Sequence, residues 1–214
     1  MLYAITDSRL MPDEILFNRV SAALAGGCRW LQYRDKSSNS ARRLQDSQKL
    51  LQLCNQHQAK LIINDDPQLA HQINAQGVHL GQGDGDVKAA RELLGPGAII
   101  GVTCHDSLEL AQKAIADGAS YIAFGRFFSS NTKPGARPAP LSLLADARKQ
   151  FPHTMIVAIG GITTENAHQV LAAGADSIAV CHSLFAAENI QAKAMSFLQL
   201  QGAAAQPAPK NISF

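Results

Sequence analysis

The sequence predicts an α/β fold with a single domain, a (β/α)8 TIM barrel, and three observations support this prediction. Eight short apolar runs alternate with longer segments whose apolar residues recur with the period of a helix. The apolar runs are almost continuously hydrophobic, which is typical of parallel strands buried on both faces. The length of 214 residues suits one barrel and is too short for two large domains. A doubly wound open sheet is the alternative architecture.

The predicted strands are rich in β-branched and aliphatic residues. In chain order they span residues 2–6, 29–34, 60–64, 77–80, 98–103, 120–125, 155–161 and 177–180. Between them, segments such as 14–27, 108–118 and 165–174 place apolar residues at positions i, i+3, i+4 and i+7, as expected for helices that pack one face against a sheet. Strict alternation of these units favours a parallel sheet that closes into a barrel.

A weak internal repeat supports the same alternation. Sequences that run from a helix end into a strand recur around Gly27, Gly77, Gly118 and Gly174. Each glycine is predicted to cap the end of its helix, because glycine adopts a left-handed backbone conformation at no steric cost.

Residues 1–200 are predicted to form the catalytic barrel domain. The segment 201–214 has no periodicity and contains two prolines, so we expect a flexible C-terminal tail there. The segment 126–140 follows a predicted strand and is long, polar and rich in proline and glycine. Loops of this kind often act as lids, so we expect this segment to border the active site.

Composition excludes several classes of partner. Hydrophobic residues make up 46% of the chain, charged residues 17%, and the formal net charge is +2. Without a run of like charges, nothing indicates binding to nucleic acid or a membrane, so small molecules are the expected partners. No apolar run is long enough to span a bilayer, and the N-terminus lacks the layout of a signal peptide. The 4 cysteines form no Cys-x-x-Cys pair and fit reduced structural thiols in a cytoplasmic protein.

Two acidic residues are candidate metal ligands. Asp65 and Asp84 follow the third and fourth predicted strands, and a barrel carries its active site at the carboxyl ends of its strands. They could share Mg²⁺, which takes one or two protein carboxylates and completes its coordination with substrate phosphate oxygens. The alternative is that Asp65 or Asp66 caps the next helix.

Basic and small residues at the carboxyl ends of other predicted strands indicate phosphate-binding sites. Arg34, Lys36 and Lys133 follow the second and sixth strands, where Arg binds phosphate through a two-pronged fork and Lys as a point charge. The pair Gly160 and Gly161 follows the seventh strand and would let backbone N–H groups approach a second phosphate. The alternative for this pair is a simple turn of the chain.

Nucleophilic hydrolysis has no support in the sequence, because no Ser-His-Asp spacing, Gly-x-Ser-x-Gly or His-Glu-x-x-His motif occurs. His105 follows the fifth strand and is either an acid or base or a cap of the next helix. Histidines within predicted helices and strands, His79 among them, are interpreted as structural or surface residues.

Eight ordered motifs resemble those of the thiamine phosphate synthase family, from residue 2 to about residue 186. They are LYAITD, LQYRDK, LIINDD, GVHLGQGD, IIGVTCH, FGRFFSSNTKP, AIGGIT and NAHQVLAAGADSIAV. The resemblance implies a transferase that joins 4-amino-2-methyl-5-hydroxymethylpyrimidine diphosphate to 4-methyl-5-hydroxyethylthiazole phosphate, or to its carboxylated form. The implied products are thiamine phosphate and pyrophosphate, formed by a dissociative displacement that Mg²⁺ assists.

The resemblance also implies roles for the residues that match these motifs. Gln32, Arg34 and Lys36 would hold the pyrimidine diphosphate together with Asn64. Asp65 and Asp84 would bind Mg²⁺. No classical acid or base is implied; Arg34, Lys36 and Lys133 would act electrostatically. The further substrate-binding residues implied are Thr103, Ser130, Asn131, Thr132, Lys133, Gly160, Gly161, Cys181 and His182.

One departure from the family pattern lies after the eighth strand, where Cys181 and His182 stand in place of a small hydroxyl residue. Two alternatives share the barrel. A thiazole tautomerase would lack the aspartate pair and carry a histidine where Arg126 stands, and a phosphate-metabolite binding protein would have lost turnover. Both Asp65 and Asp84 are present, which favours the synthase. A homo-oligomer is compatible with the sequence.

Overall fold

The computed structural model describes residues 1–129 and 138–204. The strands are β1 (Leu2–Ile5), β2 (Trp30–Tyr33), β3 (Lys60–Asn64), β4 (Gly77–Leu80), β5 (Ile99–His105), β6 (Tyr121–Phe124), β7 (Met155–Ile159) and β8 (Ser177–Val180). The helices are α1 (Glu14–Ala25), α2 (Ser40–Gln56), α3 (Pro67–Ile73), α4 (Val87–Leu94), α5 (Leu108–Ala116), α6 (Ser142–Gln150), α7 (Ala167–Ala172), α8 (His182–Phe185) and α9 (Ile190–Ala204).

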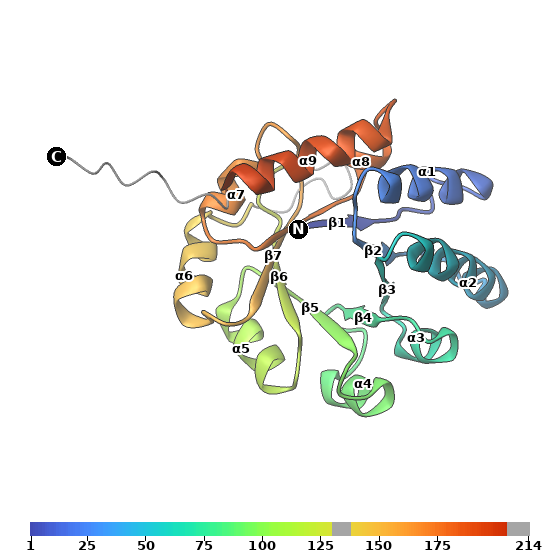
Figure 1. The fold of residues 1–214 in the computed structure, drawn as a ribbon. Helices are drawn as coiled ribbons and strands as arrows, with labels where there is room; N and C mark the ends of the chain where they lie inside the picture. Colours follow the sequence, from blue (N-terminus) through green and yellow to red (C-terminus); the bar gives the residue numbers. More distant parts are fainter. Residues whose placement is uncertain (130–137, 205–214) are drawn as a thin grey trace.

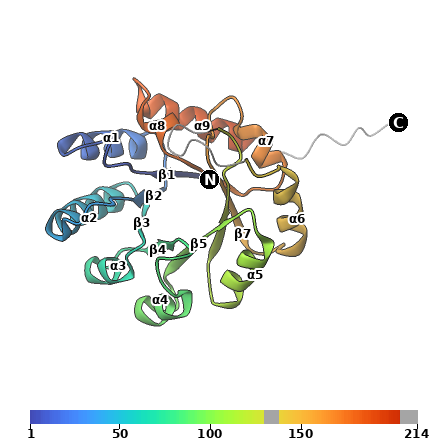
Figure 2. The same ribbon diagram turned by 180° about the vertical axis from the view of Figure 1, so that it is seen from behind.

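The strands close into a barrel. Each strand pairs in parallel with the next one along the chain, and β8 returns to pair with β1, where Leu2 lies opposite Ile178. The helices form a ring outside the strands, in chain order from α1 to α7 (Figure 1 and Figure 2). This arrangement confirms the predicted (β/α)8 fold and excludes the doubly wound open sheet.

Helix α9 occupies the outer position of the eighth barrel helix, between α1 and α7 (Figure 1). Its side chains Ile190, Ala194 and Phe197 are buried against the barrel. Because α9 continues to Ala204, the predicted boundary after residue 200 falls inside this helix rather than at its end. The rest of the predicted tail lies outside the described residues.

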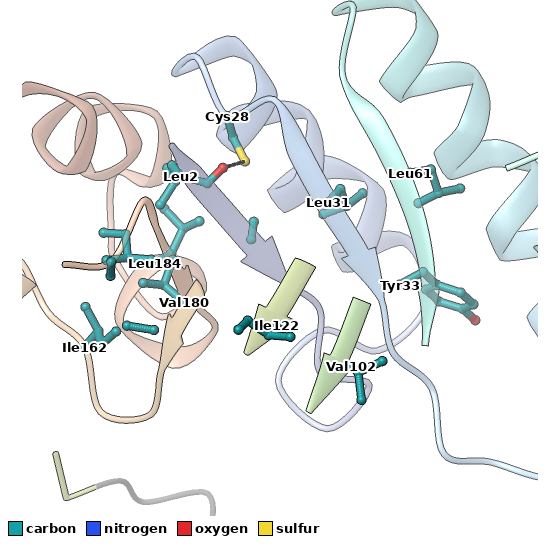
Figure 3. Packing of buried hydrophobic residues seen from close by; sticks show 14 of the residues in the cluster. Leu2, Cys28, Leu31, Tyr33, Leu61, Val102, Ile122, Ile162, Val180 and Leu184 are labelled. Carbon is teal, nitrogen blue, oxygen red and sulfur yellow. Dashed lines mark hydrogen bonds between the residues drawn. The ribbon is translucent and has the colours of Figure 1, made fainter. Parts of the chain in front are cut away.

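Buried apolar side chains divide into two groups, according to the face of the sheet from which they project. The outer layer, which includes Leu31, Leu61 and Val180, lies between the strands and the helices (Figure 3). The inner cluster comes from strand residues alone and lies inside the barrel. Its buried members are Tyr3, Ile5, Ile62, Tyr121, Ala123, Val157 and Ala179.

Three of the four glycines in the internal repeat end helices as predicted. Gly27, Gly118 and Gly174 have φ values of +96°, +99° and +121° and follow α1, α5 and α7. The prediction is wrong for Gly77, which is the first residue of β4, while Asn74 with φ +56° caps α3. Gly77 is required for a different reason, since a Cβ there would collide with the carbonyl of Ile99 in β5.

Side-chain caps begin the helices that follow the candidate site. Asp66 accepts a hydrogen bond from the backbone N–H of Leu69 (2.9 Å) and caps α3, whereas Asp65 caps no helix. Ser107 caps α5 through the N–H of Leu110 (3.1 Å), so His105 is not the cap of that helix. The capping alternative therefore applies to Asp66 and leaves the Asp65 carboxylate available for other contacts.

In the described part of the chain, no helix is long and apolar enough to cross a membrane. Cys28, Cys54 and Cys104 are free, buried thiols, and Cys181 is a free, half-buried one. Most of the predicted lid, residues 130–137, lies outside the described residues.

Candidate active site

Polar side chains gather where β2, β3 and β4 end. Lys36, in the loop after β2, forms an ion pair with Oδ2 of Asp65, which directly follows β3. Asn64, the last residue of β3, donates from Nδ2 to the same oxygen at 2.6 Å. Asp65 has a left-handed backbone with φ +63°, a conformation that aspartate tolerates better than most residues. The backbone thus turns sharply at the point where this carboxylate leaves the strand.

The carboxyl groups of Asp65 and Asp84 interact directly, with Asp84 as the protonated partner that donates a hydrogen bond to the Asp65 carboxylate. Burial, then the hydrogen bond and charge of Asp65, raises the pKa of Asp84. For Asp65, burial opposes ionisation, but the hydrogen bonds of Lys36, Asp84 and Asn64 outweigh it and lower the pKa. Two carboxyl groups in contact repel once both are ionised, so this position favours additional positive charge.

The donor set of this pair fits Mg²⁺. Within residues 1–129 and 138–204, no group of three or more His, Cys, Asp or Glu side chains gathers to hold a metal. Two carboxylates suffice for Mg²⁺, which keeps waters and takes substrate phosphate oxygens. The Asp84 carboxylate folds back over Gly81, where a Cβ would collide with it. Gly81 therefore makes room for the carboxylate that meets Asp65.

The loop that carries Arg34 and Lys36 is held in place by neighbouring side chains. The backbone N–H of Arg34 donates to Oγ1 of Thr6 at 2.8 Å, which ties the loop to the end of β1. The buried carboxylate of Asp35 accepts from the N–H of Ser37 at 2.8 Å. Arg34 and Lys36 thus stand on a loop with fixed ends, as a preorganised anion site requires.

A chain of four hydrogen bonds crosses the inside of the barrel. Nε2 of Gln32 donates to the hydroxyl of Tyr3, and that hydroxyl bonds to the hydroxyl of Tyr121. Nδ1 of His79 bonds to Tyr121, and Nε2 of His79 bonds to Oγ1 of Thr103. Each of the four contacts is 2.8 Å long. The chain links strands β2, β1, β6, β4 and β5.

The middle of this chain is deeply buried and uncharged. Burial raises the pKa values of the Tyr3 and Tyr121 hydroxyls, so both stay protonated. Burial also lowers the pKa of His79 to about 4, although the charge of Asp65 opposes the shift. Gly101 in β5 makes room for the Tyr121 ring, because a Cβ at this glycine would overlap the ring.

The opposite side of the barrel mouth contains the glycine pair. Gly160 and Gly161 have φ values of +100° and +66° and follow β7. A Cβ on Gly160 would lie 2.6 Å from Cα of Arg126, and one on Gly161 would lie 2.7 Å from the carbonyl oxygen of Phe128. Packing against the segment after β6 therefore requires glycine at both positions.

The residues after β8 complete this side. Cys181 directly follows β8, and His182, the first residue of the short helix α8, is exposed. Burial and then the charge of Asp7 raise the pKa of Cys181 to about 12, while the charge of Arg34 opposes this shift. The charge of Arg34, which follows β2, therefore acts on the thiol of Cys181, which follows β8.

The structure thus gathers Lys36, Asn64, Asp65 and Asp84. Gln32 is joined to Thr103 in β5 through the interior chain, and the glycine pair lies across the mouth. The remaining predicted site residues Ser130, Asn131, Thr132 and Lys133 lie outside the described residues.

Comparison with known proteins identifies the family. A sequence model described as thiamine monophosphate synthase matches residues 2–184. The chain belongs to the thiamine monophosphate synthase family. It shares 60% identity over 200 residues with a thiamine-phosphate synthase of Saccharophagus degradans, covering 93% of this chain and 92% of that protein. It is 55% identical over 184 residues to a thiamine-phosphate synthase of Alcanivorax borkumensis, covering 86% and 84% of the two chains.

Solved structures include a similar member of the thiamine monophosphate synthase family. The thiamine phosphate pyrophosphorylase from Pyrococcus furiosus superposes with a TM-score of 0.86 at 32% identity, over 96% of each chain. Membership of this family makes the chain an enzyme, a transferase with thiamine-phosphate synthase function. The non-catalytic alternative is therefore wrong, and both named relatives are synthases rather than tautomerases.

Analysis of the sequence missed Tyr3 and Tyr121 as site residues and interpreted His79 as structural. All three lie in the barrel interior and bond in line with Gln32 and Thr103, two residues that the thiamine monophosphate synthase motifs imply. A signal was present in the sequence: each is a polar side chain within an otherwise apolar strand. Strand register is needed to see that they face one another.

Proposed function

We propose that this transferase joins an aminopyrimidine diphosphate to a thiazole phosphate and releases pyrophosphate. The observation that carries this proposal is the Asp65 and Asp84 carboxylate pair, with Lys36 in contact with Asp65 at the ends of adjacent strands. Paired carboxylates with a lysine bound to one of them suit a substrate that brings both a divalent metal and phosphate charge. The substrates themselves are 4-amino-2-methyl-5-hydroxymethylpyrimidine diphosphate and 4-methyl-5-hydroxyethylthiazole phosphate, or the carboxylated form of the latter.

In the proposed reaction, the bond between the pyrimidine methylene carbon and the diphosphate oxygen breaks first. The electron pair leaves with pyrophosphate, and the electron-rich aminopyrimidine stabilises the resulting cation. The lone pair of the thiazole nitrogen then forms the new carbon–nitrogen bond. With the carboxylated thiazole, the carboxylate then leaves as CO2, and its bonding electron pair stays on the thiazolium ring carbon, which takes up a proton. Such a displacement needs neutralisation of the leaving group and accurate positioning more than a general base.

Asp65 and Asp84 would hold Mg²⁺ in this scheme. When bound, the metal would act as a Lewis acid on the leaving diphosphate. Lys36, now paired with Asp65, would exchange that carboxylate for a diphosphate oxygen. Arg34 and Lys133 would neutralise the remaining charge, Arg34 through a two-pronged contact.

Gln32 and Asn64 would hold the pyrimidine, and Thr103 would contact the diphosphate. The thiazole phosphate would lie on the β6 to β8 side, near the glycine pair. Its proposed contacts are Ser130, Asn131, Thr132, Gly160, Gly161, Cys181 and His182. His182 is exposed, so its imidazole is available to an incoming phosphate.

The test combines purified protein with both substrates and follows thiamine phosphate and pyrophosphate, with Mg²⁺ and with EDTA. We expect both products in equal amounts, only with Mg²⁺. Product formation that persists in EDTA would contradict the metal proposal alone. Tight binding of either substrate without product would contradict the proposed reaction. Parallel assays with the carboxylated thiazole decide which thiazole the site prefers, and gel filtration tests whether the protein forms a homo-oligomer.

A further inference from the structure

The hydrogen-bond chain inside the barrel joins two residues of the proposed substrate site through three residues that have no role in the proposed reaction. Gln32 stands at one end and Thr103 at the other, with Tyr3, Tyr121 and His79 between them. Tyr3 and Tyr121 are 1% and 0% exposed, so solvent does not compete for their hydroxyls. Such a chain constrains its own proton positions.

Each middle member has one proton to donate. A tyrosine hydroxyl carries one, and a neutral imidazole carries one on either Nδ1 or Nε2. A tyrosine hydroxyl can accept two hydrogen bonds, but a buried hydroxyl proton that finds no acceptor is costly, so Tyr3 and Tyr121 each donate to a neighbour in the chain. A member that accepts on one side then donates on the other when every bond is kept. All four bonds then run in the same direction, and only two arrangements of the whole chain exist.

The Gln32 end selects one of these arrangements. Its Nε2 donates to Tyr3, so Tyr3 donates to Tyr121, and Tyr121 donates to Nδ1 of His79. The proton of His79 is then on Nε2 and is donated to Thr103. The hydroxyl proton of Thr103 is left to point away from the chain, where it can bind an anionic oxygen. In the opposite arrangement, the hydroxyl of Thr103 would donate that proton to Nε2 of His79.

We propose that Tyr3, Tyr121 and His79 are positioning residues that fix the hydrogen-bond direction of both Gln32 and Thr103. Gln32 keeps its amide oxygen and its second Nε2 proton, a pattern that complements an aminopyrimidine edge. Thr103 presents a donor, which complements a diphosphate oxygen. Gln32 at one end of the chain thereby recognises the pyrimidine ring, and Thr103 at the other end recognises the diphosphate of the same substrate. The assignment of ligands rests on the proposed function, whereas the direction of the chain does not.

Nitrogen-15 NMR of histidine-labelled protein at neutral pH tests the direction, because the two ring nitrogens differ in chemical shift according to which carries the proton. The His79 signals are assigned by their loss in His79→Gln. We expect Nε2 to be protonated and Nδ1 to be an acceptor. Protonation of Nδ1 in the unsubstituted protein would overturn the proposal, even if the enzyme makes thiamine phosphate.

Variants at the far end of the chain test the coupling. Gln32→Met removes the donor that sets the direction, and Tyr3→Phe breaks the chain while keeping both the ring and the contact between Tyr121 and His79. We expect either change to give a mixture of His79 tautomers. Tyr33→Phe is the matched control, because the Tyr33 hydroxyl bonds to Asp46 at 3.3 Å, outside the chain. A His79 tautomer unchanged in both Gln32→Met and Tyr3→Phe would overturn the coupling.

Binding of inorganic pyrophosphate with Mg²⁺ supplies the functional readout. Tyr3→Phe should weaken this binding about fivefold, which is the effect of losing one modest hydrogen bond. The effect is expected although Tyr121 and His79 stand between the lost hydroxyl and Thr103. The KM for the pyrimidine diphosphate should rise more than kcat falls. Unchanged pyrophosphate affinity in Tyr3→Phe would show that the chain does not orient Thr103. If the unsubstituted protein lacks synthase activity but keeps the Nε2 tautomer and this loss of affinity, only the proposed reaction fails.

Discussion

The outer layer and the inner cluster are both buried, yet they differ in chemistry. In β3, Leu61 and Ile63 pack into the apolar outer layer, while Ile62 between them faces the inside. In β6, Ile122 faces the helices, while Tyr121 lies in the interior and bonds to His79. The outer face of each strand thus supports stability, whereas the inner face also holds polar groups beneath the active site. Substitutions on the two faces should therefore have separable effects.

The largest expected effect is on stability, from Leu61→Ala in the outer layer. Leu61 is 0% exposed, and truncating such a leucine costs about 3 kcal/mol of unfolding free energy because it leaves a cavity. Denaturant unfolding measures this loss, and kcat of the folded protein should be unchanged. Lys60→Ala, at the exposed neighbouring position, is the control and should remain near the unsubstituted stability. A large fall in kcat for Leu61→Ala would contradict the separation of the two faces.

Asp84→Asn should have the next largest effect, and on turnover rather than stability. Losing one proposed metal ligand should lower kcat/KM about 100-fold, equivalent to about 2.7 kcal/mol. The melting temperature should hold or rise slightly, because Asn carries no charge for burial and Asp65 to disfavour, the two causes that raise the pKa of Asp84. Asp86→Asn in the same loop is the control, since Asn also caps a helix such as α4. Normal Mg²⁺-dependent kinetics in Asp84→Asn would refute the ligand assignment.

Gly101→Ala should affect both properties, because it introduces a Cβ against the Tyr121 ring. Overpacking of this kind costs about 2 kcal/mol, and displacement of Tyr121 should raise the KM for the pyrimidine diphosphate. Thermal unfolding and steady-state kinetics measure the two effects. Gly97→Ala is the matched control, since a Cβ at Gly97 meets nothing within 4 Å. If Gly101→Ala lowered stability without changing KM, the interior chain would be irrelevant to binding.

The smallest effect concerns thiol reactivity and leaves the fold intact. Burial and Asp7 raise the pKa of Cys181 to about 12, so iodoacetamide at pH 8 should modify it at least about tenfold more slowly than a free cysteine. Its rate should increase with pH from 7 to 10. Cys181 is half-buried and should react before the buried Cys28, Cys54 and Cys104. Peptide mapping by mass spectrometry measures the order in which the cysteines are modified, with Cys181→Ser as the control. Modification of a buried cysteine before Cys181 would contradict the prediction.

The fold was predictable because its signals are local. Alternation of strands and helices, and glycines such as Gly118 with φ +99° after α5, can be identified without knowing the tertiary structure. Gly77 was misassigned because its constraint is not local: the carbonyl of Ile99 in the neighbouring strand excludes a side chain. A glycine in the sequence indicates that some constraint exists but not which one.

The site was predictable where residues directly follow strands. Asp65 and Asp84 could be paired because adjacent parallel strands end at the same edge, although their metal role stays a prediction. Tyr3 and Tyr121 escaped notice because strands buried on both faces do not distinguish inside from outside in sequence. Their 2.8 Å contact joins residues that are 118 positions apart in the sequence, so no local sequence pattern can indicate it.

Closure of the barrel also affects how the molecule meets other chains. Every strand from β1 to β8 has a hydrogen-bonded neighbour on each side, and the pairing of β1 with β8 completes the ring. An open sheet ends in rows of unsatisfied backbone N–H and C=O groups that can recruit a foreign strand. Within residues 1–129 and 138–204 this ring leaves no such row, so its strands offer no template for strand addition or for growth into cross-β aggregates.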